Sequence, residues 1–554
     1  MSISVLIEKV IKKNTKFIIV TGGVCSSLGK GVLTSSIGVL LKNSGYTLSV
    51  VKWDPYLNVD PGTMSPLVHG EVFVTDDGAE TDLDLGHYER ILGIRLTKDS
   101  SVSSGKIFKE ILDSERQGKF LGRDIQYVPH VVEVIQRRLL KLALGSKLDF
   151  VLVEIGGTVG DMEGIAFLES IRQLRMKLPE KQLMLCHLSL VPYLSWANEL
   201  KTKPTQHSVI FLKKAGLAPD ALFLRLDRGI DLKERNKLSV MCGIEKELIF
   251  EDLTLNPLSK LFVDLEKQGL NEKIQKWFGI KKVKKTDISG WKKLIQVISK
   301  AKKILNIGLI AKYVGSNDPY LSVIKALESA GYLQGYKVNI ELIEAEKLVF
   351  EGYGSAGSFW KKLKKVDGIV IPGGFDERGA EGKILAARWA REKKVPFLGL
   401  CLGMQIMLIE FARSMLKLKN ASSTEFDKKT KYPIISLLEE QKEISIKGGT
   451  MRLGAYPCYL KSGTQASAIY KKKEILERHR HRYEFNNKYR NMFEKYGIVF
   501  SGIYKKENLV EIAEFKDHPF MIGCQFHPEF LSTPLKSHPL FKEFIKNAIK
   551  TSKR

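Results

Sequence analysis

The residues from Thr21 to Gly31 form a glycine-rich string that suits phosphate binding. The string, Thr-Gly-Gly-Val-Cys-Ser-Ser-Leu-Gly-Lys-Gly, follows the β-branched run Phe17–Val20 and precedes Val32–Lys42, whose spacing is helical. In a strand–loop–helix unit, backbone N–H groups and the positive end of the helix face a phosphate, and Lys30 adds a mobile charge. A tight turn with a solvated lysine is the alternative. The combination of glycines, serines and lysine favours phosphate binding.

This loop departs from the regular phosphate-loop pattern at its end. Gly31 stands where a serine or threonine usually offers its hydroxyl to Mg²⁺, so the metal needs other ligands. Glu154 ends an apolar run, as a Walker B carboxylate does, and a buried carboxylate needs a cation partner. Asp84 closes the acidic stretch Asp76–Asp84, for which a solvated loop is the alternative. We expect Asp84 and Glu154 to hold Mg²⁺ together with substrate phosphates.

Cys401 has the sequence surroundings of a nucleophile. Gly-Leu-Cys-Leu-Gly ends the apolar run Val395–Leu400 and opens a helical stretch, which is the cysteine form of a nucleophile elbow. The turn would hold the sulfur at a helix N-terminus, where a thiolate is favoured. A buried inert cysteine is the commoner explanation, but a later string supplies partners: His527 can take the thiol proton and Glu529 can orient the imidazole. Cys524 is expected only to pack.

Two further strings are suited to polar ligands. Pro372-Gly373-Gly374-Phe375 follows an apolar run, and its N–H groups, with that of Leu402, are candidates for an oxyanion hole. The string from Lys201 to Gln206, Lys-Thr-Lys-Pro-Thr-Gln, combines two ammonium groups, two hydroxyls and an amide, which suits a second anionic ligand. For so short a string, an exposed loop is the usual alternative.

The elements that position these groups follow from the spacing of apolar residues. Strand-like runs alternate with helical segments in the first half, and the alternation restarts near residue 304. It predicts an α/β fold with two mostly parallel sheets flanked by helices, with ligands at the carboxyl ends of the strands. The predicted strands are Phe17–Val20, Leu48–Trp53, Phe150–Ile155, Leu183–Leu190, Ala221–Leu226, Leu305–Ile310, Val338–Ile343, Gly368–Ile371 and Val395–Leu400.

The length of 554 residues also requires more than one domain. We predict an amphipathic N-terminal extension at 1–16, a first domain at 17–280, a linker at 281–303 and a second domain at 304–554. The linker is charged, weakly periodic and contains one helical candidate, Ser289–Leu305.

Composition narrows the class of protein. No apolar run reaches the length of a membrane span and the N-terminus lacks the features of a secretion signal. Six scattered cysteines without a Cys-x-x-Cys pair argue against disulfides and structural zinc, and indicate a cytoplasmic protein. The net charge of +26 admits a nucleic-acid partner, but the lysines are dispersed, so this remains the minority interpretation; anionic nucleotides suit a basic protein equally well.

Taken together, the strings resemble those of the CTP synthases, glutamine-dependent enzymes that aminate UTP. The resemblance rests on 21–31, 54–66, 69–90, 153–161 and 201–206, which run through most of the first half. Cys401, His527 and Glu529 with the glycines resemble a class I (triad-type) glutaminase domain, from about residue 304 to the C-terminus.

The resemblance implies a role for each matching position. ATP would contact Ser27, Leu28, Gly29, Lys30, Gly31, Val32, Asp84 and Leu253, the last in the adenine-contacting segment Glu251–Leu253. UTP or CTP would contact Ser26, Asp161, Met162, Glu163, Lys201, Thr202, Lys203, Pro204, Thr205, Gln206 and Lys237. Glutamine would contact Gly374, Leu402, Gly403, Met404, Gln405, Glu425 and Arg482; the last two suit an α-ammonium and an α-carboxylate. Pro66, His69 and Val72 would lie at the mouth of an ammonia passage.

The resemblance implies an ATP-dependent amination of UTP through a 4-phosphorylated intermediate, with ammonia supplied by glutamine. It also implies a requirement for Mg²⁺, feedback inhibition by CTP and a homotetrameric enzyme. GTP is the expected activator, but Asp376 and Glu377 follow Gly-Gly-Phe where relatives usually begin with glycine, which would weaken that response. A different ATP-dependent amidotransferase, a nucleic-acid-binding protein and a filament-forming role alongside catalysis are the alternatives.

Overall fold

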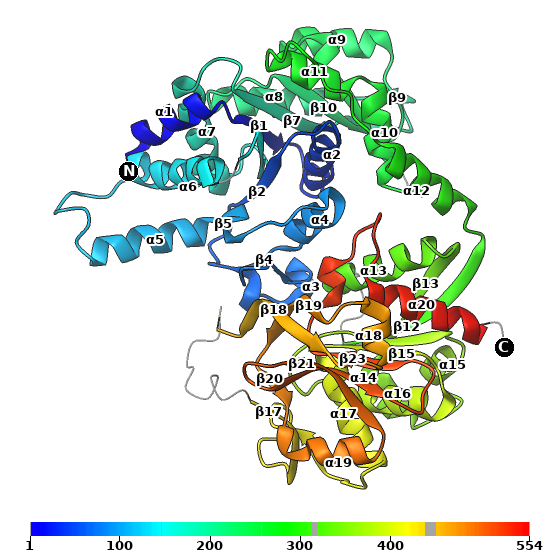
Figure 1. Cartoon of the computed structure of the whole chain (residues 1–554). Coiled ribbons are helices and arrows are strands. Elements are labelled where there is room, and N and C mark those ends of the chain that lie inside the picture. Colours follow the sequence, from blue (N-terminus) through cyan, green and yellow to red (C-terminus); the bar gives the residue numbers. More distant parts are fainter. Residues whose placement is uncertain (1, 146, 256, 313–317, 438–449, 553–554) are drawn as a thin grey trace. The chain divides into compact units, whose positions relative to one another are not determined.

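The structure is a computed structural model of the chain, and it describes all residues except 1, 146, 256, 313–317, 438–449 and 553–554 (Figure 1). The chain forms two compact units. The first comprises Met1–Asp60 and His87–Ile295, and the second Pro61–Gly86 and Gln296–Arg554. Within the described ranges, no helix has both the length and the apolar character needed to cross a membrane.

The first unit is built on a seven-stranded sheet in the order β11-β10-β7-β1-β6-β2-β5, and every neighbouring pair is parallel. This confirms the predicted parallel sheet, and β6, β7 and β10 have the predicted bounds. The strands are β1 Lys16–Gly22, β2 Leu48–Asp54, β5 Ser101–Ser103, β6 Phe150–Ile155, β7 Leu183–Leu190, β10 Ala221–Leu226 and β11 Ile249–Leu253, with a small hairpin of β8 Tyr193–Leu194 and β9 Glu199–Leu200.

Helices cover this sheet. The apolar side chains of α1, α6 and α7 join those of β1 and β6 in one core, so the N-terminal extension is a packed helix of this domain. The helices are α1 Ile3–Lys13, α2 Lys30–Asn43, α4 Leu83–Leu92, α5 Ser104–Arg116, α6 Val132–Gly145, α7 Ile165–Lys177, α8 Lys203–Lys214, α9 Leu232–Cys242, α10 Ser259–Lys267, α11 Leu270–Trp277 and α12 Ser289–Lys300.

The second unit has a nine-stranded sheet in the order β13-β12-β14-β15-β23-β22-β21-β18-β19. The strands from β13 to β23 in this order are parallel, as predicted, but those from β22 to β19 are antiparallel. The sheet strands are β12 Lys303–Ala311, β13 Tyr336–Glu344, β14 Gly368–Ile371, β15 Phe397–Leu400, β18 Arg452–Leu460, β19 Glu474–His481, β21 Ile498–Tyr504, β22 Leu509–Phe515 and β23 Met521–Cys524.

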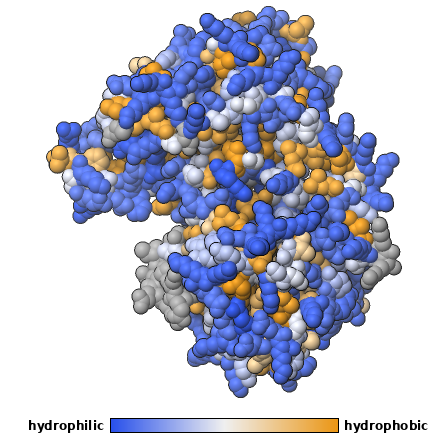
Figure 2. All heavy atoms as spheres, in the orientation of Figure 1, coloured by the Kyte–Doolittle hydropathy of each residue, from blue (hydrophilic) through white to orange (hydrophobic). Residues whose placement is uncertain are grey.

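Two cores flank this second sheet, one with side chains of α13 and α20 and the other with side chains of α14 to α17. The helices are α3 Pro66–His69, α13 Leu321–Tyr332, α14 Ala345–Glu351, α15 Ser358–Lys364, α16 Ala380–Lys393, α17 Leu402–Ser414, α18 Gln465–Tyr470, α19 Arg490–Lys495 and α20 Pro539–Ser552. Smaller sheets are formed by β16 Ala421–Ser423, β17 Tyr432–Leu437 and β20 Tyr483–Phe485, and by β3 Phe73–Val74 and β4 Glu80–Thr81. On the face drawn in Figure 2, hydrophilic residues predominate and hydrophobic ones are scattered among them.

Pro61–Gly86 groups with the second unit although it lies early in the chain. Arg478 and Arg480 of β19 pair with Asp76 and Glu80 at 2.5 and 2.8 Å. The Phe73 ring packs edge-on against another aromatic ring, and the Arg478 guanidinium lies 5.1 Å from the Phe73 centroid. The acidic stretch is therefore a docked segment, and not the solvated loop considered as an alternative.

Candidate active sites

The predicted phosphate loop connects β1 to α2, and α2 begins at Lys30. Gly29 caps the helix with φ 102°, a left-handed conformation that favours glycine, and a Cβ there would lie 2.1 Å from Arg225 Nη2. Lys30 is buried, and its ammonium donates to the Gly157 carbonyl. The loop and its lysine therefore have the predicted strand–loop–helix context, and the Lys30 ammonium is hydrogen-bonded within the protein.

Arg225 and Asp252 support this loop from neighbouring strands. The Arg225 guanidinium donates from Nε to the Leu28 carbonyl at 2.9 Å and pairs with Asp252 at 3.0 Å. Burial raises the pKa of Asp252 to about 7, while Arg225 opposes that rise. Asp252 lies next to the predicted adenine contact Leu253 at the end of β11, so this ion pair fixes the strand end near which we expect ATP.

His187 was not predicted, and it connects the loop's strand to α8. Its Nδ1 lies 2.8 Å from Thr21 Oγ1 and its Nε2 lies 2.7 Å from Ser208 Oγ. Burial, assisted by the Lys30 charge, lowers the pKa of His187 to about 3, so the imidazole is neutral. A lone histidine within the apolar run of β7 gives no functional signal in the sequence.

Glu154 is the last residue but one of β6, near the strand end where it was predicted, and it is buried. Its cation partner in the structure is Lys52, whose Nζ lies 2.8 Å from Glu154 Oε1, and the Tyr88 hydroxyl donates to Glu154 Oε2. The need for a cation is thus met by Lys52 on β2, whose pairing with Glu154 was not predicted.

Asp84 occupies the first turn of α4 and belongs to the second unit, so its sharing of a metal ion with Glu154 stays a prediction. No group of three or more potential ligands from histidine, cysteine, aspartate and glutamate occurs within the described ranges. Two carboxylates fit Mg²⁺ by donor type, provided that nucleotide phosphates supply further oxygen ligands.

The predicted uridine-nucleotide string forms the beginning of α8, and not the exposed loop considered as an alternative. Three of its side chains face inward: Thr205 donates to the Leu190 carbonyl at 2.9 Å, and Gln206 donates to Thr202 Oγ1 at 3.0 Å. Lys201 pairs with Glu199 at 2.6 Å. Lys203 is exposed at the first position of α8, so a cation and a helix N-terminus lie together, a combination that suits an anion.

The remaining predicted nucleotide contacts surround α8. Lys201, and to a smaller extent Lys237 of α9, lower the pKa of Glu199, so both lysines lie near one carboxylate. Asp161 accepts the Thr158 N–H at 2.8 Å, and the next residue, Met162, is 80% exposed. In the adenine segment Glu251 is held by Arg235 at 2.6 Å, so its carboxylate already has a partner.

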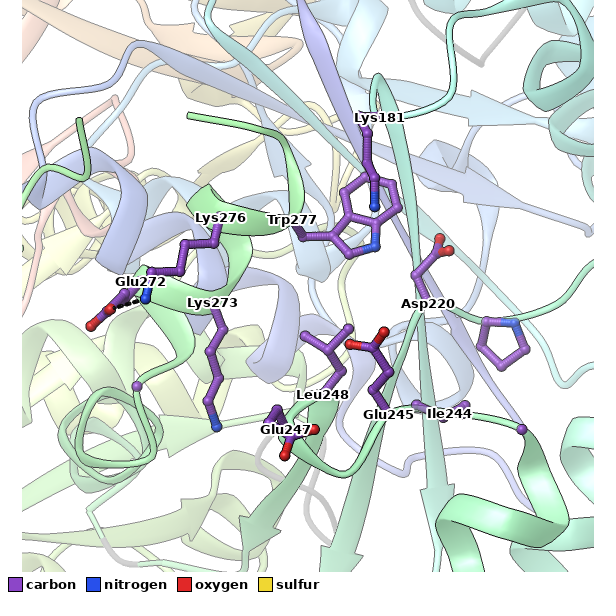
Figure 3. A pocket seen from close by; sticks show the side chains of 13 residues that line it. Lys181, Asp220, Ile244, Glu245, Glu247, Leu248, Glu272, Lys273, Lys276 and Trp277 are labelled. Atoms are coloured by element: carbon purple, nitrogen blue, oxygen red, sulfur yellow. Dashed lines mark ion pairs between the residues drawn. The ribbon is translucent and has the colours of Figure 1, made fainter. Parts of the chain in front are cut away.

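A separate cavity of about 670 Å³ opens in the first unit (Figure 3). It is lined at the amino ends of β7, β10 and β11 by Lys181, Asp220 and Leu248, and by residues of α11 such as Trp277. Ligands of parallel sheets bind at the carboxyl ends of strands. This cavity is therefore not the expected ATP or UTP site, and it contains none of the predicted site residues.

Cys401 forms the predicted nucleophile elbow in the second unit. It lies between β15 and α17 with φ 50° and ψ −103°, a strained conformation for a non-glycine residue. Gly399 and Gly403 permit the close approach, since a Cβ on Gly403 would lie 2.1 Å from the Ile371 carbonyl oxygen. The Cys401 sulfur lies 3.6 Å from Gln525 Nε2 and 3.8 Å from the Arg480 carbonyl oxygen.

His527 and Glu529 complete a triad with Cys401. His527 Nδ1 lies 2.7 Å from Glu529 Oε1, and the imidazole stacks on Phe530. Burial by itself would lower the pKa of His527, but Glu529 and Cys401 together raise it to about 10. An imidazolium beside the sulfur favours the thiolate, which is the reactive form of cysteine. Cys524 is buried and burial raises its pKa well above the usual value, as expected for a packing residue.

The glycine pair at the end of β14 faces this triad. A Cβ on Gly373 would lie 2.7 Å from His527 Cε1, and one on Gly374 would lie 3.3 Å from Leu402 Cδ2. The predicted contact Met404 packs its side chain against Gly523, so only its backbone is available to a ligand. Gln405 is also turned inward and donates to the Tyr483 carbonyl at 2.9 Å.

The two side chains predicted to bind the α-ammonium and the α-carboxylate of glutamine each have a hydrogen-bond partner within the protein. Glu425 accepts the Asp376 N–H at 2.7 Å, and Arg482 donates to Thr450 Oγ1 at 2.9 Å. Asp376, the first residue after Gly-Gly-Phe, has φ 66° and pairs with Lys312 at 2.5 Å. Lys383, which was not predicted, is also buried, and the charges of Lys312, Asp376 and Glu425 act on its ammonium.

The predicted ammonia-passage residues lie on the docked segment. Pro66 and His69 are the ends of α3, and Val72 follows it. Glu71, between them, accepts hydrogen bonds from the backbone and hydroxyl of Ser322, the former at 2.9 Å. These contacts attach the segment to the second unit at α13.

Comparison with known proteins matches both halves of the chain. The family profile described as "CTP synthase N-terminus" matches residues 16–280, and that described as "Glutamine amidotransferase class-I" matches residues 317–547. The CTP synthase of Halalkalibacterium halodurans is 47% identical, covering 97% of this chain and 99% of its own, and that of Bacillus subtilis is 47% identical, covering 96% and 98%. A Trypanosoma brucei glutaminase domain with bound acivicin is 32% identical over 44% of this chain and 94% of its own, with a TM-score of 0.41. The chain belongs to the CTP synthase family.

Proposed function

We propose that this protein is a glutamine-hydrolysing CTP synthase, a ligase that forms CTP from UTP, ATP and glutamine. The observation that carries the proposal is the presence, in one chain of this family, of a nucleophile elbow with a His–Glu pair and a phosphate loop with a buried lysine. The first suits amide hydrolysis and the second suits phosphoryl transfer, two reactions that need different pockets.

In the glutaminase reaction, the Cys401 thiolate attacks the side-chain amide carbon of glutamine. The N–H groups of Gly374 and Leu402 stabilise the oxyanion, and the His527 imidazolium gives its proton to the departing ammonia. Water then hydrolyses the thioester, with His527 as general base, and releases glutamate. Glu529 orients the imidazole and stabilises its charge throughout.

In the synthetase reaction, the γ-phosphoryl group of ATP passes to O4 of UTP. Lys30 leaves the Gly157 carbonyl and meets the phosphates together with the N–H groups of the loop. Asp84 and Glu154 would hold Mg²⁺, which neutralises phosphate charge when bound. Ammonia then attacks C4 of the phosphorylated uridine ring, and phosphate leaves.

Several finer properties belong to this proposal. Neutral ammonia must be kept from protonation, and Pro66, His69 and Val72 are placed on one segment that can border an internal passage. CTP would inhibit through Asp161, Met162 and Glu163. We expect GTP activation and a homotetramer, as the resemblance implies. All six cysteines are free of disulfides, in keeping with a cytoplasmic enzyme.

The alternatives are less well supported. A different amidotransferase would not require the full-length similarity to CTP synthases, and the net charge of +26 suits anionic nucleotides as well as nucleic acid. One assay separates these possibilities, because only CTP synthase forms CTP from UTP, ATP, Mg²⁺ and glutamine.

The decisive variant is Cys401→Ala. We expect glutamine-dependent CTP formation to disappear, while formation from ammonium chloride continues at the wild-type rate. Cys458→Ala is a matched control, since Cys458 is another buried cysteine of the same unit outside the triad. If Cys401→Ala retains glutamine-dependent synthesis, the triad assignment is wrong; if the wild-type chain forms no CTP from either nitrogen source, the proposed function is wrong.

A further inference from the structure

The His527 imidazole is stacked on the ring of Phe530. The two ring centroids lie 5.1 Å apart and the planes differ by 13°, an offset stack that holds one ring against the other. Turning the imidazole about its Cβ–Cγ bond would move Nε2, the nitrogen that the proposed reaction uses for proton transfer. Glu529 restrains this turn at Nδ1, on the edge of the ring, through a contact of 2.7 Å. Phe530 restrains it from the face, so two contacts of different kinds set the direction of Nε2.

Phe530 in turn packs against Phe73 of the docked segment. Phe530 is buried in the short 3₁₀ helix Pro528–Leu531, and its ring meets that of Phe73 edge-on, with centroids 4.9 Å apart and planes at 62°. Phe73 lies in β3 and is completely buried. Gly86 leaves room for this ring, since a Cβ there would lie 2.7 Å from Phe73 Cδ2. Phe530 is therefore in contact with both the imidazole and a ring of Pro61–Gly86.

Arg478 of β19 closes this set of contacts. Its guanidinium lies 5.1 Å from the Phe73 centroid and pairs with Asp76 at 2.5 Å. Its carbonyl accepts the His527 N–H at 2.8 Å. His527, Phe530, Phe73 and Arg478 thus form a closed loop, in which each residue contacts two of the others. Because a packed interior has few voids, a change in the volume or shape of one member displaces its neighbours.

We propose that Phe73 and Phe530 are positioning residues of the glutaminase reaction, which hold the His527 ring in the plane needed for proton transfer to the departing ammonia. The proposal rests on the proposed function, since it assumes that His527 transfers protons in glutamine hydrolysis. Both rings act through His527, and neither takes part in bond formation. Phe73 lies within the residues matched by the CTP synthase N-terminus profile. The part of the chain assigned to the nucleotide reaction therefore also completes the glutaminase site.

The test measures glutamine hydrolysis by variants that keep an apolar side chain but lose the flat ring. For Phe530→Leu we expect kcat to fall about tenfold with the KM for glutamine within about twofold of wild type, because a misdirected imidazole slows proton transfer without altering substrate binding. Phe73→Leu should lower kcat about threefold, because Phe73 acts only through Phe530. In the double variant, the loss should equal that of Phe530→Leu alone. Phe530→Met, whose flexible side chain fills the space without a flat face, should behave like Phe530→Leu.

Phe493→Leu is the matched control, since Phe493 is completely buried in the same unit, where its ring packs on Phe411 and Phe485. It should lower the thermal unfolding temperature to a similar extent as Phe530→Leu but leave kcat unchanged. Ammonia-dependent CTP formation by Phe530→Leu should stay at the wild-type rate, which identifies a folded protein. Two results would overturn the proposal: an unchanged kcat in Phe530→Leu, or an equal loss of kcat in Phe493→Leu. Failure of the proposed function itself would look different, since wild-type protein would then release no glutamate from glutamine.

Discussion

The two candidate active sites differ in how far the protein alone has organised them. In the glutaminase site, the strained elbow and the His527–Glu529 pair are set by contacts within the protein, and Glu529 and Cys401 raise the pKa of His527 to about 10. In the nucleotide site, the charged groups are engaged with the protein: Lys30 with a carbonyl, Lys52 with Glu154 and Lys201 with Glu199. On the proposed function, the first site is preorganised for a neutral amide, and we expect the second to exchange its internal partners for phosphates.

This difference predicts distinct responses to substitution. In a preorganised site, removing any member of the triad costs activity but leaves the binding of substrate largely intact. In the nucleotide site, lysines such as Lys30 should contribute to catalysis only after nucleotide binding has released them from their partners within the protein. The predictions below test this contrast, beginning with the largest effect.

Lys30→Ala should separate the two sites most clearly. We expect ammonia-dependent CTP formation to fall by about 10³-fold, as for loss of a main electrostatic donor, while glutamine hydrolysis remains measurable. The measurement is CTP formation with ammonium chloride beside glutamate release. Lys42→Ala, at the opposite end of α2, is the control. Undiminished ammonia-dependent synthesis would show that the loop does not bind the reacting phosphates.

Glu529→Gln should reduce glutamine hydrolysis by roughly 10²- to 10⁴-fold, because the imidazolium loses its counter-ion. The Glu529 carboxylate helps to raise the pKa of His527 to about 10, and so keeps the ring charged as the pH increases toward that value. In the variant the charge should be lost at lower pH. The rate of Cys401 alkylation against pH measures this, and an unchanged alkaline limb would contradict a role for Glu529.

His187→Leu tests the framework of the nucleotide site. It leaves Thr21 and Ser208 without their shared imidazole, so we expect a loss of about 2 kcal/mol in the free energy of unfolding. In the folded protein the pKa of His187 is about 3, below its ordinary value of 6.5. Between pH 6.5 and pH 3, therefore, His187 takes up a proton only in the unfolded chain. The free energy of unfolding of the wild type should fall as the pH is lowered through this range. The variant should lose this contribution.

Denaturant unfolding at pH 7 and pH 5 measures both effects of His187→Leu. His207→Leu, at an exposed position on α8 next to Ser208, is the control. Equal stability of wild type and His187→Leu at pH 7 would show that the imidazole does not hold the strand to the helix.

Asp376→Gly should have the smallest effect. Glycine adopts φ 66° without strain and releases Lys312, so we expect half-maximal GTP stimulation at a concentration about two- to fivefold lower, corresponding to ~0.5–1 kcal/mol. Stimulated glutamine hydrolysis over a GTP series measures the change. Glu377→Gln removes a neighbouring charge without altering the backbone; an equal shift in both variants would assign the effect to charge alone.

The sequence was most informative where function is carried by consecutive residues. The phosphate loop, the elbow at Cys401 and the parallel strands were predicted, because glycines and apolar runs report local backbone geometry directly. The antiparallel strands β18, β19, β21 and β22 were not predicted. Charges account for this only in β19, which reads Glu-Ile-Leu-Glu-Arg-His-Arg-His; β21 reads Ile-Val-Phe-Ser-Gly-Ile-Tyr and carries none.

Other features depend on pairing across long stretches of chain. Lys52 and Glu154 are 102 residues apart, and Thr21 and His187 are 166 apart. Nothing in the neighbourhood of Lys383 in the sequence indicates that its side chain is buried. Such partners become visible only when the sheet brings its strands together.

The docking of Pro61–Gly86 on the second unit has a consequence for dissecting this protein. A shortened gene product that starts at Gln296 would contain the whole triad but not Asp76 and Glu80. Arg478, which is completely buried, would lose its counter-ion, at a cost of about 3–5 kcal/mol. The carbonyl of that same arginine accepts the His527 N–H at 2.8 Å, and the Arg480 carbonyl contacts the Cys401 sulfur. A glutaminase excised at the apparent boundary would therefore be poorly active for a structural reason, and supplying residues 61–86 as a separate peptide should restore it.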